Sequence, residues 1–173
     1  MIRWQFEKLA PVWGQTVSPE GDLLVAGALE RVPAATRALD VGTGTGRGAQ
    51  ALVTRFPEAE VTGVDVSPGM IEEARQRVPA ASFEVGDAAH LPFDDESFDL
   101  VTHTNMIPFL DEVARVLRPG GWTLFAYTNG AGTPIYVRPE LLRQELGRRG
   151  FADFADVAIG SGIAVLARRT EQG

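Results

Sequence analysis

Short apolar runs and amphipathic stretches alternate along the chain, and glycine or proline stands between them. Seven runs have the length and composition of buried strands: residues 39–41, 61–66, 83–85, 98–102, 122–127, 157–159 and 163–167. Apolar residues between them recur with helical spacing. A chain in which strands and helices alternate in this way predicts an α/β fold, with a mostly parallel sheet covered by helices on both faces.

Two of the predicted helices have clear boundaries. Ala49, Leu52 and Phe56 follow helical spacing, and Pro57 ends that stretch. Ser67-Pro68 predicts the start of another helix, because serine caps exposed N–H groups and proline is favoured at the first helical position. Similar patterns predict helices over residues 19–30, 110–117 and 141–149.

Two glycine-containing segments predict turns. Pro119-Gly120-Gly121 has the composition of a tight turn before the fifth strand. The last two apolar runs are separated only by Gly160, Ser161 and Gly162, which is too short for a crossover helix. The last two strands are therefore predicted to form an antiparallel hairpin.

Composition narrows the class of protein. A chain of 173 residues with 45% hydrophobic and 23% charged residues is expected to form one domain, residues 1–173, with a substantial core. The absence of cysteine excludes disulfides and thiolate metal sites, and we expect no metal. A net charge of −7 argues against nucleic acid as a partner. No run approaches membrane-spanning length and no secretion signal is recognisable, so a cytoplasmic protein without membrane association is expected.

A glycine-rich loop with nearby carboxylates is the main chemical signal. Residues 40–46 read Asp-Val-Gly-Thr-Gly-Thr-Gly and join the first predicted strand to a helix, where glycines allow close approach of a ligand. Asp65 ends the second strand, 19 residues after Gly46, a suitable place to bind ribose hydroxyls. An adenosine-containing cofactor is indicated, and a nicotinamide dinucleotide remains an alternative. Asp40 favours a ligand with a cationic group over a pyrophosphate.

Five segments together resemble the class I S-adenosylmethionine-dependent methyltransferases of the small-molecule type. These are residues 40–46, Asp65 with 67–70, 86–88, 98–101 and 115–121, and the resemblance extends over residues 4–168. It implies a Rossmann-like, doubly wound seven-stranded sheet in the order 3-2-1-4-5-7-6 with strand 7 antiparallel. The antiparallel strand agrees with the hairpin predicted from the residues themselves.

The resemblance also implies a set of residues that contact S-adenosylmethionine, or S-adenosylhomocysteine as product. They surround the methionine part, the ribose and the adenine, and they are Asp40, Gly42, Thr43, Gly44, Gly46, Asp65, Val66, Met70, Asp87, Ala88 and His103. Residues 1–17 would form an arm over the site, with Trp13 near the cofactor. His103 is also the expected catalytic base if the acceptor needs one, because an ordinary histidine titrates near neutral pH.

The acceptor side is less defined by the sequence. The segment between the fifth strand and the next helix is short, which indicates a shallow, open pocket. Such a pocket fits a large acceptor, or one that a partner protein or a second subunit completes, although a small-molecule acceptor is the expected substrate. Tyr127, Asn129, Tyr136 and Arg138 are the expected substrate-side residues. Three functions are compared: a methyltransferase, a cofactor-binding module without catalysis that serves regulation or interaction, and a nicotinamide oxidoreductase.

Overall fold

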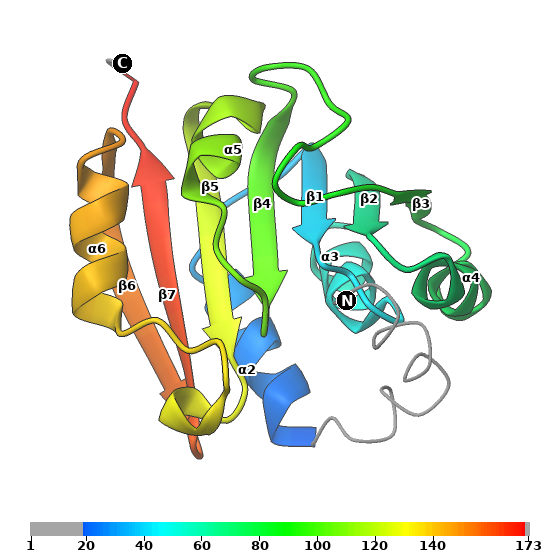
Figure 1. Ribbon diagram of the computed structural model, residues 1–173, viewed down its shortest axis with the longest axis horizontal. Coiled ribbons are helices and arrows are strands. Elements are labelled where there is room, and N and C mark those ends of the chain that lie inside the picture. Colours follow the sequence, from blue (N-terminus) through cyan, green and yellow to red (C-terminus); the bar gives the residue numbers. More distant parts are fainter. Residues whose placement is uncertain (1–18, 172–173) are drawn as a thin grey trace.

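Seven strands form one sheet in the order β3-β2-β1-β4-β5-β7-β6 in the computed structural model, which describes residues 19–171 (Figure 1). Their bounds are β1 Arg37–Val41, β2 Glu60–Asp65, β3 Ser82–Val85, β4 Phe98–Thr104, β5 Leu117–Tyr127, β6 Phe151–Ile159 and β7 Gly162–Arg169. All neighbours are parallel except β7, which runs antiparallel to both β5 and β6. The predicted fold class and strand order are confirmed.

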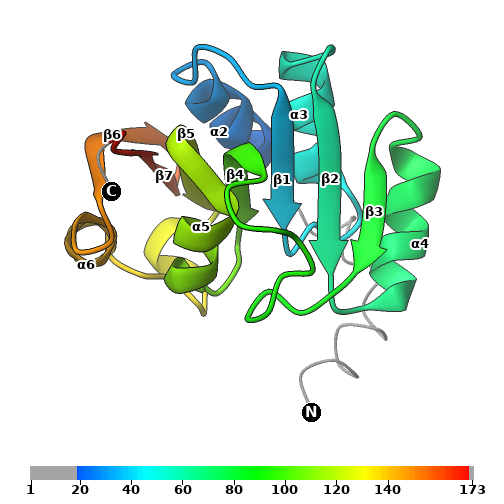
Figure 2. The same cartoon turned by 90° about the horizontal axis from the view of Figure 1, so that it is seen from above.

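Helices cover both faces of this sheet (Figure 2). They are α2 Pro19–Leu29, α3 Arg47–Arg55, α4 Pro68–Arg77, α5 Leu110–Val116 and α6 Pro139–Gly147, with a 3₁₀ turn at Gly130–Gly132. Buried residues of α2, α3 and α4 share one apolar cluster, and those of α5 and α6 belong to a second cluster on the opposite face. Ser67 caps α4 as predicted, because its Oγ accepts the N–H of Met70 at 3.3 Å.

The fifth strand begins earlier than its apolar run. Leu117 pairs with Phe98 and Trp122 pairs with Leu100, so the residues between Leu117 and Trp122 bulge out of the ladder. Gly120 has a φ of 82°, which glycine adopts without strain. The predicted turn at residues 119–121 is therefore a bulge inside β5 rather than a boundary before it.

The sixth strand is also longer than predicted and lies at an edge of the sheet. It begins at Phe151, six residues before the apolar run at 157–159. Its pairing with β7 shifts register between Ala152 and Ala155, and Asp153 between them has a φ of 52°. This bulge breaks the alternation of apolar and polar residues by which a strand is recognised.

Some predictions lie outside what the structure tests. The arm at residues 1–17, including Trp13, lies outside the described residues. None of the helices within residues 19–171 is long and apolar enough to cross a membrane. The cytoplasmic location stays a prediction.

Candidate functional site

A cavity of about 420 Å³ opens at the carboxyl ends of the parallel strands. Its walls come from β1, β2, β4 and the segments that follow them. The strand order reverses between β1 and β4, and the cavity extends to both sides of that point. Ligands of open α/β sheets bind at this position. Nine of the predicted cofactor residues line the cavity: Asp40, Gly42, Thr43, Gly44, Asp65, Val66, Met70, Asp87 and Ala88.

The glycine loop is tied to the end of β2. Gly42 and Gly44 have φ values of 67° and 55°, in the left-handed region that favours glycine. The N–H of Thr43 donates to the Val64 carbonyl at 2.9 Å. Gly44 N–H donates to Oδ2 of Asp65 at 2.9 Å. The loop is therefore held in one position against the second strand.

Asp65 is a preorganised carboxylate. Its Oδ1 accepts the N–H of Ser67 at 3.0 Å, and its Oδ2 accepts the Gly44 N–H described above. Burial raises the pKa of Asp65, and the N–H groups of Ser67 and Gly44 oppose that rise. A carboxylate offers about four lone-pair positions, so both oxygens retain acceptor capacity toward the cavity.

Asp40 lies deeper, beneath the first turn of α3. It is 2% exposed, and its Oδ1 accepts the Thr102 hydroxyl at 2.8 Å. A methyl group on Gly48 would lie 2.6 Å from the carboxylate, so glycine at that position allows α3 to start directly above Asp40. Burial raises the pKa of Asp40 to about 6, against the hydrogen bonds that stabilise its ionised form.

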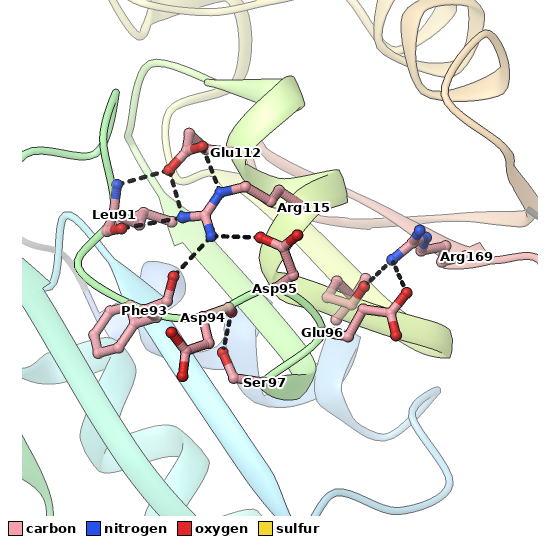
Figure 3. Close-up of polar contacts among 10 residues, drawn as sticks. Leu91, Phe93, Asp94, Asp95, Glu96, Ser97, Glu112, Arg115 and Arg169 are labelled. Carbon is pink, nitrogen blue, oxygen red and sulfur yellow. Dashed lines mark hydrogen bonds and ion pairs between the residues drawn. The ribbon is translucent and has the colours of Figure 1, made fainter.

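The loop after β3 forms the wall that carries Asp87 and Ala88, and Arg115 of α5 holds this loop in place (Figure 3). Arg115 donates to the carbonyls of Leu91 at 3.0 Å and Phe93 at 2.7 Å, and to Asp95 at 2.9 Å. Glu112 binds Arg115 through both carboxylate oxygens and also accepts the Leu91 N–H at 2.7 Å. The hydrogen bond from Arg115 lowers the pKa of Glu112. Neither residue was predicted to have this role.

The segment after β4 crosses the opposite side of the cavity. Asn105 has a φ of 52° and is fixed by Thr128, with Nδ2 donating to the threonine hydroxyl at 2.8 Å and Oδ1 accepting its N–H at 3.0 Å. Asparagine tolerates this left-handed conformation better than most residues. The next residue, Met106, lies against the glycine loop, where a methyl group on Gly42 would be 2.5 Å from its Sδ.

Gly46 does not line the cavity, which differs from its predicted contact with cofactor. Its φ is 94°, and it caps the start of α3. A methyl group there would lie 3.2 Å from Ala74 Cβ and Val78 Cγ2. This glycine allows α3 to pack closely against α4 and the residue after it.

His103 does not line the cavity either, and its predicted role as a base facing the substrate is not supported by its position. It is 2% exposed and stacks on Phe125 with ring centroids 4.3 Å apart. Its Nδ1 lies 3.3 Å from the Leu124 carbonyl, which fits an Nδ1–H donor. Burial lowers the pKa of His103 to about 4, so the ring is neutral at physiological pH.

We expect His103 to stay uncharged in the folded protein between pH 8 and pH 5. The lowered pKa means that the unfolded histidine takes up a proton from about pH 6.5, whereas the folded one does so near 4. The contribution of the neutral His103 to the free energy of unfolding is therefore lost as pH falls from about 6.5 to about 4. The test follows the Cε1–H NMR resonance of His103, assigned by its absence in His103→Gln. A midpoint above pH 6 would contradict this prediction.

The substrate-side prediction is also revised. Tyr127, Asn129, Tyr136 and Arg138 do not line the cavity, and the lining residues from this part of the chain are Thr128 and Ile135. Tyr127 is 1% exposed and packs edge-to-face against Tyr136, in the core on the α5 and α6 face. Among residues 19–171 no cluster of His, Asp and Glu side chains is arranged to hold a metal ion.

Comparison with known proteins agrees with this fold and cavity. Residues 38–121 match the family described as methyltransferase domain. The chain is 34% identical over 163 residues to trans-aconitate 2-methyltransferase of Methylobacterium nodulans, covering 88% of this chain and 59% of that protein. It is 42% identical over 113 residues to a fatty-acid O-methyltransferase of Mycolicibacterium smegmatis, covering 60% of this chain and 40% of that protein. The chain thus spans about half of these relatives' lengths.

Solved structures show the same fold. A Haloferax volcanii methyltransferase, solved in complex with the Trm112 methyltransferase activator, superposes with a TM-score of 0.85 at 21% identity, covering 100% of this chain and 99% of that one. A methyltransferase from Thermotoga maritima superposes with a TM-score of 0.77 at 20% identity, covering 96% and 100%. The matching domain, the relatives and the shared fold support a class I S-adenosylmethionine-dependent methyltransferase, with S-adenosylmethionine as the cofactor.

Proposed function

We propose that this chain transfers a methyl group from S-adenosylmethionine to a small-molecule acceptor. The observation that carries the proposal is Asp65, whose two oxygens are anchored by the N–H groups of Ser67 and Gly44 at the wall of a cavity of about 420 Å³. Fixed in this way, the carboxylate fits two adjacent ribose hydroxyls, and its charge strengthens both hydrogen bonds.

The other lining residues fit the rest of the cofactor. Met70, Val66 and Ala88 offer apolar surface next to Asp65, suited to an adenine ring, and Asp87 would accept its amino group. The glycine loop and Asp40 would hold the methionine part, whose ammonium group suits a carboxylate. Each of these contacts is part of the proposal.

The chemistry needs little from the protein beyond alignment. S-adenosylmethionine supplies a methyl group already activated on a sulfonium. The chain's own residues would bind and orient the two reactants, which is worth about 7–11 kcal/mol of the barrier in favourable cases. Asn105 and Thr128 hold the segment that faces the glycine loop, so that the two sides of the cavity keep a fixed separation.

Calorimetric titration of the purified chain with S-adenosylhomocysteine tests the proposal. We expect one site with micromolar affinity. Titration with reduced nicotinamide dinucleotide, followed by its fluorescence, is the matched control and is expected to show no binding. A folded sample that binds the dinucleotide and not S-adenosylhomocysteine would favour the oxidoreductase.

A cofactor-binding module without catalysis is the alternative. It shares the expected affinity for S-adenosylhomocysteine, so binding does not separate the two. Transfer of a labelled methyl group to any member of an acceptor panel would establish catalysis. Failure with every member, at full cofactor occupancy, would favour a regulatory or interaction role.

A second copy or partner subunit that completes the pocket stays a prediction. It is supported by the cavity's opening beside the short segment after β5, and by the similar Haloferax volcanii methyltransferase, whose structure contains an activator protein. Light scattering of the purified chain gives its mass directly. A monomer that binds S-adenosylhomocysteine and transfers methyl groups would contradict the need for a partner.

A further inference from the structure

The side chain of Arg115 uses every N–H group that it has (Figure 3). A guanidinium carries five of them in a rigid plane. Two donate to the Glu112 carboxylate, at 2.8 and 2.9 Å. The other three donate to the carbonyls of Leu91 and Phe93 and to Asp95, at 3.0, 2.7 and 2.9 Å. Arg115 therefore joins α5 to three points of another segment.

That segment is the loop between β3 and β4, residues 86–97, which forms no helix or strand of its own. Leu91 lies at its middle, and α5 binds both of its backbone polar groups. Its N–H donates to Oε2 of Glu112 at 2.7 Å, and its carbonyl accepts from Arg115. Its side chain is 6% exposed and packs in the same apolar cluster as Val113 and Val116 of α5. The backbone at Leu91 is thereby fixed relative to α5.

The turn that carries Asp87 ends at this fixed point. The N–H of His90 donates to the Asp87 carbonyl at 3.0 Å, and the N–H of Ala89 donates to Oδ1 of Asp87 at 2.8 Å. Residues 87–90 are thus closed into one turn, and Leu91 follows it directly. The direction of the Asp87 carboxylate at the cavity wall depends on where Leu91 is held.

We propose that Arg115 and Glu112 are positioning residues that set the preference of the cofactor site for adenine over other purines. This inference rests on the proposed binding of S-adenosylmethionine and deepens it, because it assigns base selectivity to a pair of residues that do not line the cavity. A carboxylate attracts the 6-amino group of adenine and repels the 6-oxo group of hypoxanthine. Hydrogen bonds weaken steeply with poor geometry, so this discrimination requires that Asp87 is held in place.

Lysine cannot replace Arg115 in this arrangement. An ammonium group offers three donors at a single point, whereas the five contacts of Arg115 come from three nitrogens spread over a plane. Arg115→Lys thus keeps the charge and loses at least two of the hydrogen bonds. The turn at residues 87–90 would then occupy a wider range of positions, and the preference for adenine would fall.

The test compares S-adenosylhomocysteine with S-inosylhomocysteine, which differs from it in the base alone, by calorimetric titration. We expect the wild type to bind S-adenosylhomocysteine about 30-fold or more tightly than the inosine compound, because a hydrogen bond to a charged group is lost. Arg115→Lys is expected to lower this preference about fivefold or more. A general loss of stability would lower the bound fraction of both compounds alike and would leave the preference unchanged.

Two further variants locate the effect. Arg149→Lys is the matched control, because Arg149 also binds two carboxylates, those of Asp111 and Glu145, but does not contact the loop or line the cavity. It is expected to change neither affinity. In an Asp87→Ala background, Arg115→Lys is expected to change the preference less than about twofold, because the two residues act through one contact. If Arg115→Lys does not fold, as judged by circular dichroism, Glu112→Gln takes its place.

The outcomes separate this inference from the proposed function. If S-adenosylhomocysteine binds but the wild type does not discriminate between the bases, the positioning role is refuted and the methyltransferase stands. The same holds if the Arg115 variant, or the Glu112 variant in its place, keeps the full preference. If S-adenosylhomocysteine does not bind the folded wild type, the methyltransferase proposal fails and this inference fails with it.

Discussion

Replacing Asp65 by asparagine is expected to weaken S-adenosylhomocysteine binding about 100-fold or more. The substitution removes the charge that strengthens two hydrogen bonds to the ribose, each worth about 1.5–3 kcal/mol. In the wild type, the N–H groups of Gly44 and Ser67 each donate to one carboxylate oxygen of Asp65. The asparagine amide group would face one of these N–H groups with a donor in place of an acceptor. Calorimetry on Asp65→Asn measures the loss.

The control for this prediction changes charge by the same amount elsewhere. Glu58 is exposed and does not line the cavity, so Glu58→Gln is expected to bind as the wild type does. Circular dichroism confirms that both variants are folded. A Kd for Asp65→Asn within threefold of the wild type would remove Asp65 from the binding site.

Asp40 is expected to make the free protein less stable as pH rises. Burial raises its pKa to about 6 in the folded protein, from 3.8 for an ordinary exposed aspartate. Between these values the folded state holds a proton that the unfolded state has released, so the free energy of unfolding falls as pH increases. At low pH this difference in pKa contributes about 3 kcal/mol to the free energy of unfolding. The contribution is fully lost above pH 6.

Urea unfolding of the wild type and Asp40→Asn from pH 3.5 to pH 8 measures this effect. The stability of the wild type relative to the variant should decline from about pH 4 to about pH 6 and then level off. Thr102→Val removes a hydrogen bond that favours the ionised form, so it should extend the decline to higher pH. A relative stability that rises with pH would contradict the prediction.

The fold could be predicted because each of its elements leaves a local pattern. The glycine loop, Asp65 and the cap at Ser67 stand at strand ends, where chain order alone places them at one edge of a parallel sheet. The short loop before β7 requires an antiparallel neighbour. These inferences need the order of elements and no knowledge of side-chain direction.

The position of His103 shows what such patterns leave undetermined. Successive residues of a strand face opposite sides of the sheet. Thr102 bonds Asp40 on the α3 side, and His103 therefore turns toward Phe125 on the other face. A sequence that is apolar on both faces does not reveal which residue points where.

The part of the cavity wall that follows β4 was missed for a different reason. Met106, Ile107 and Phe109 follow no helical or strand spacing, and their position depends on the left-handed backbone at Asn105 and its bonds to Thr128. That pairing joins residues 23 positions apart. Long-range contacts of this kind appear only once the strands are assembled.

The bulge at Asp153 has a consequence for how the molecule behaves in solution. Among residues 19–171, β6 is an edge strand of the sheet, and the outer row of backbone N–H and C=O groups of a flat edge strand can template pairing with another chain. The register shift between Ala152 and Ala155 interrupts that row, and it places an acidic residue within the interruption. A bulge with an acidic residue is one of the features that disfavour edge-to-edge growth of a sheet.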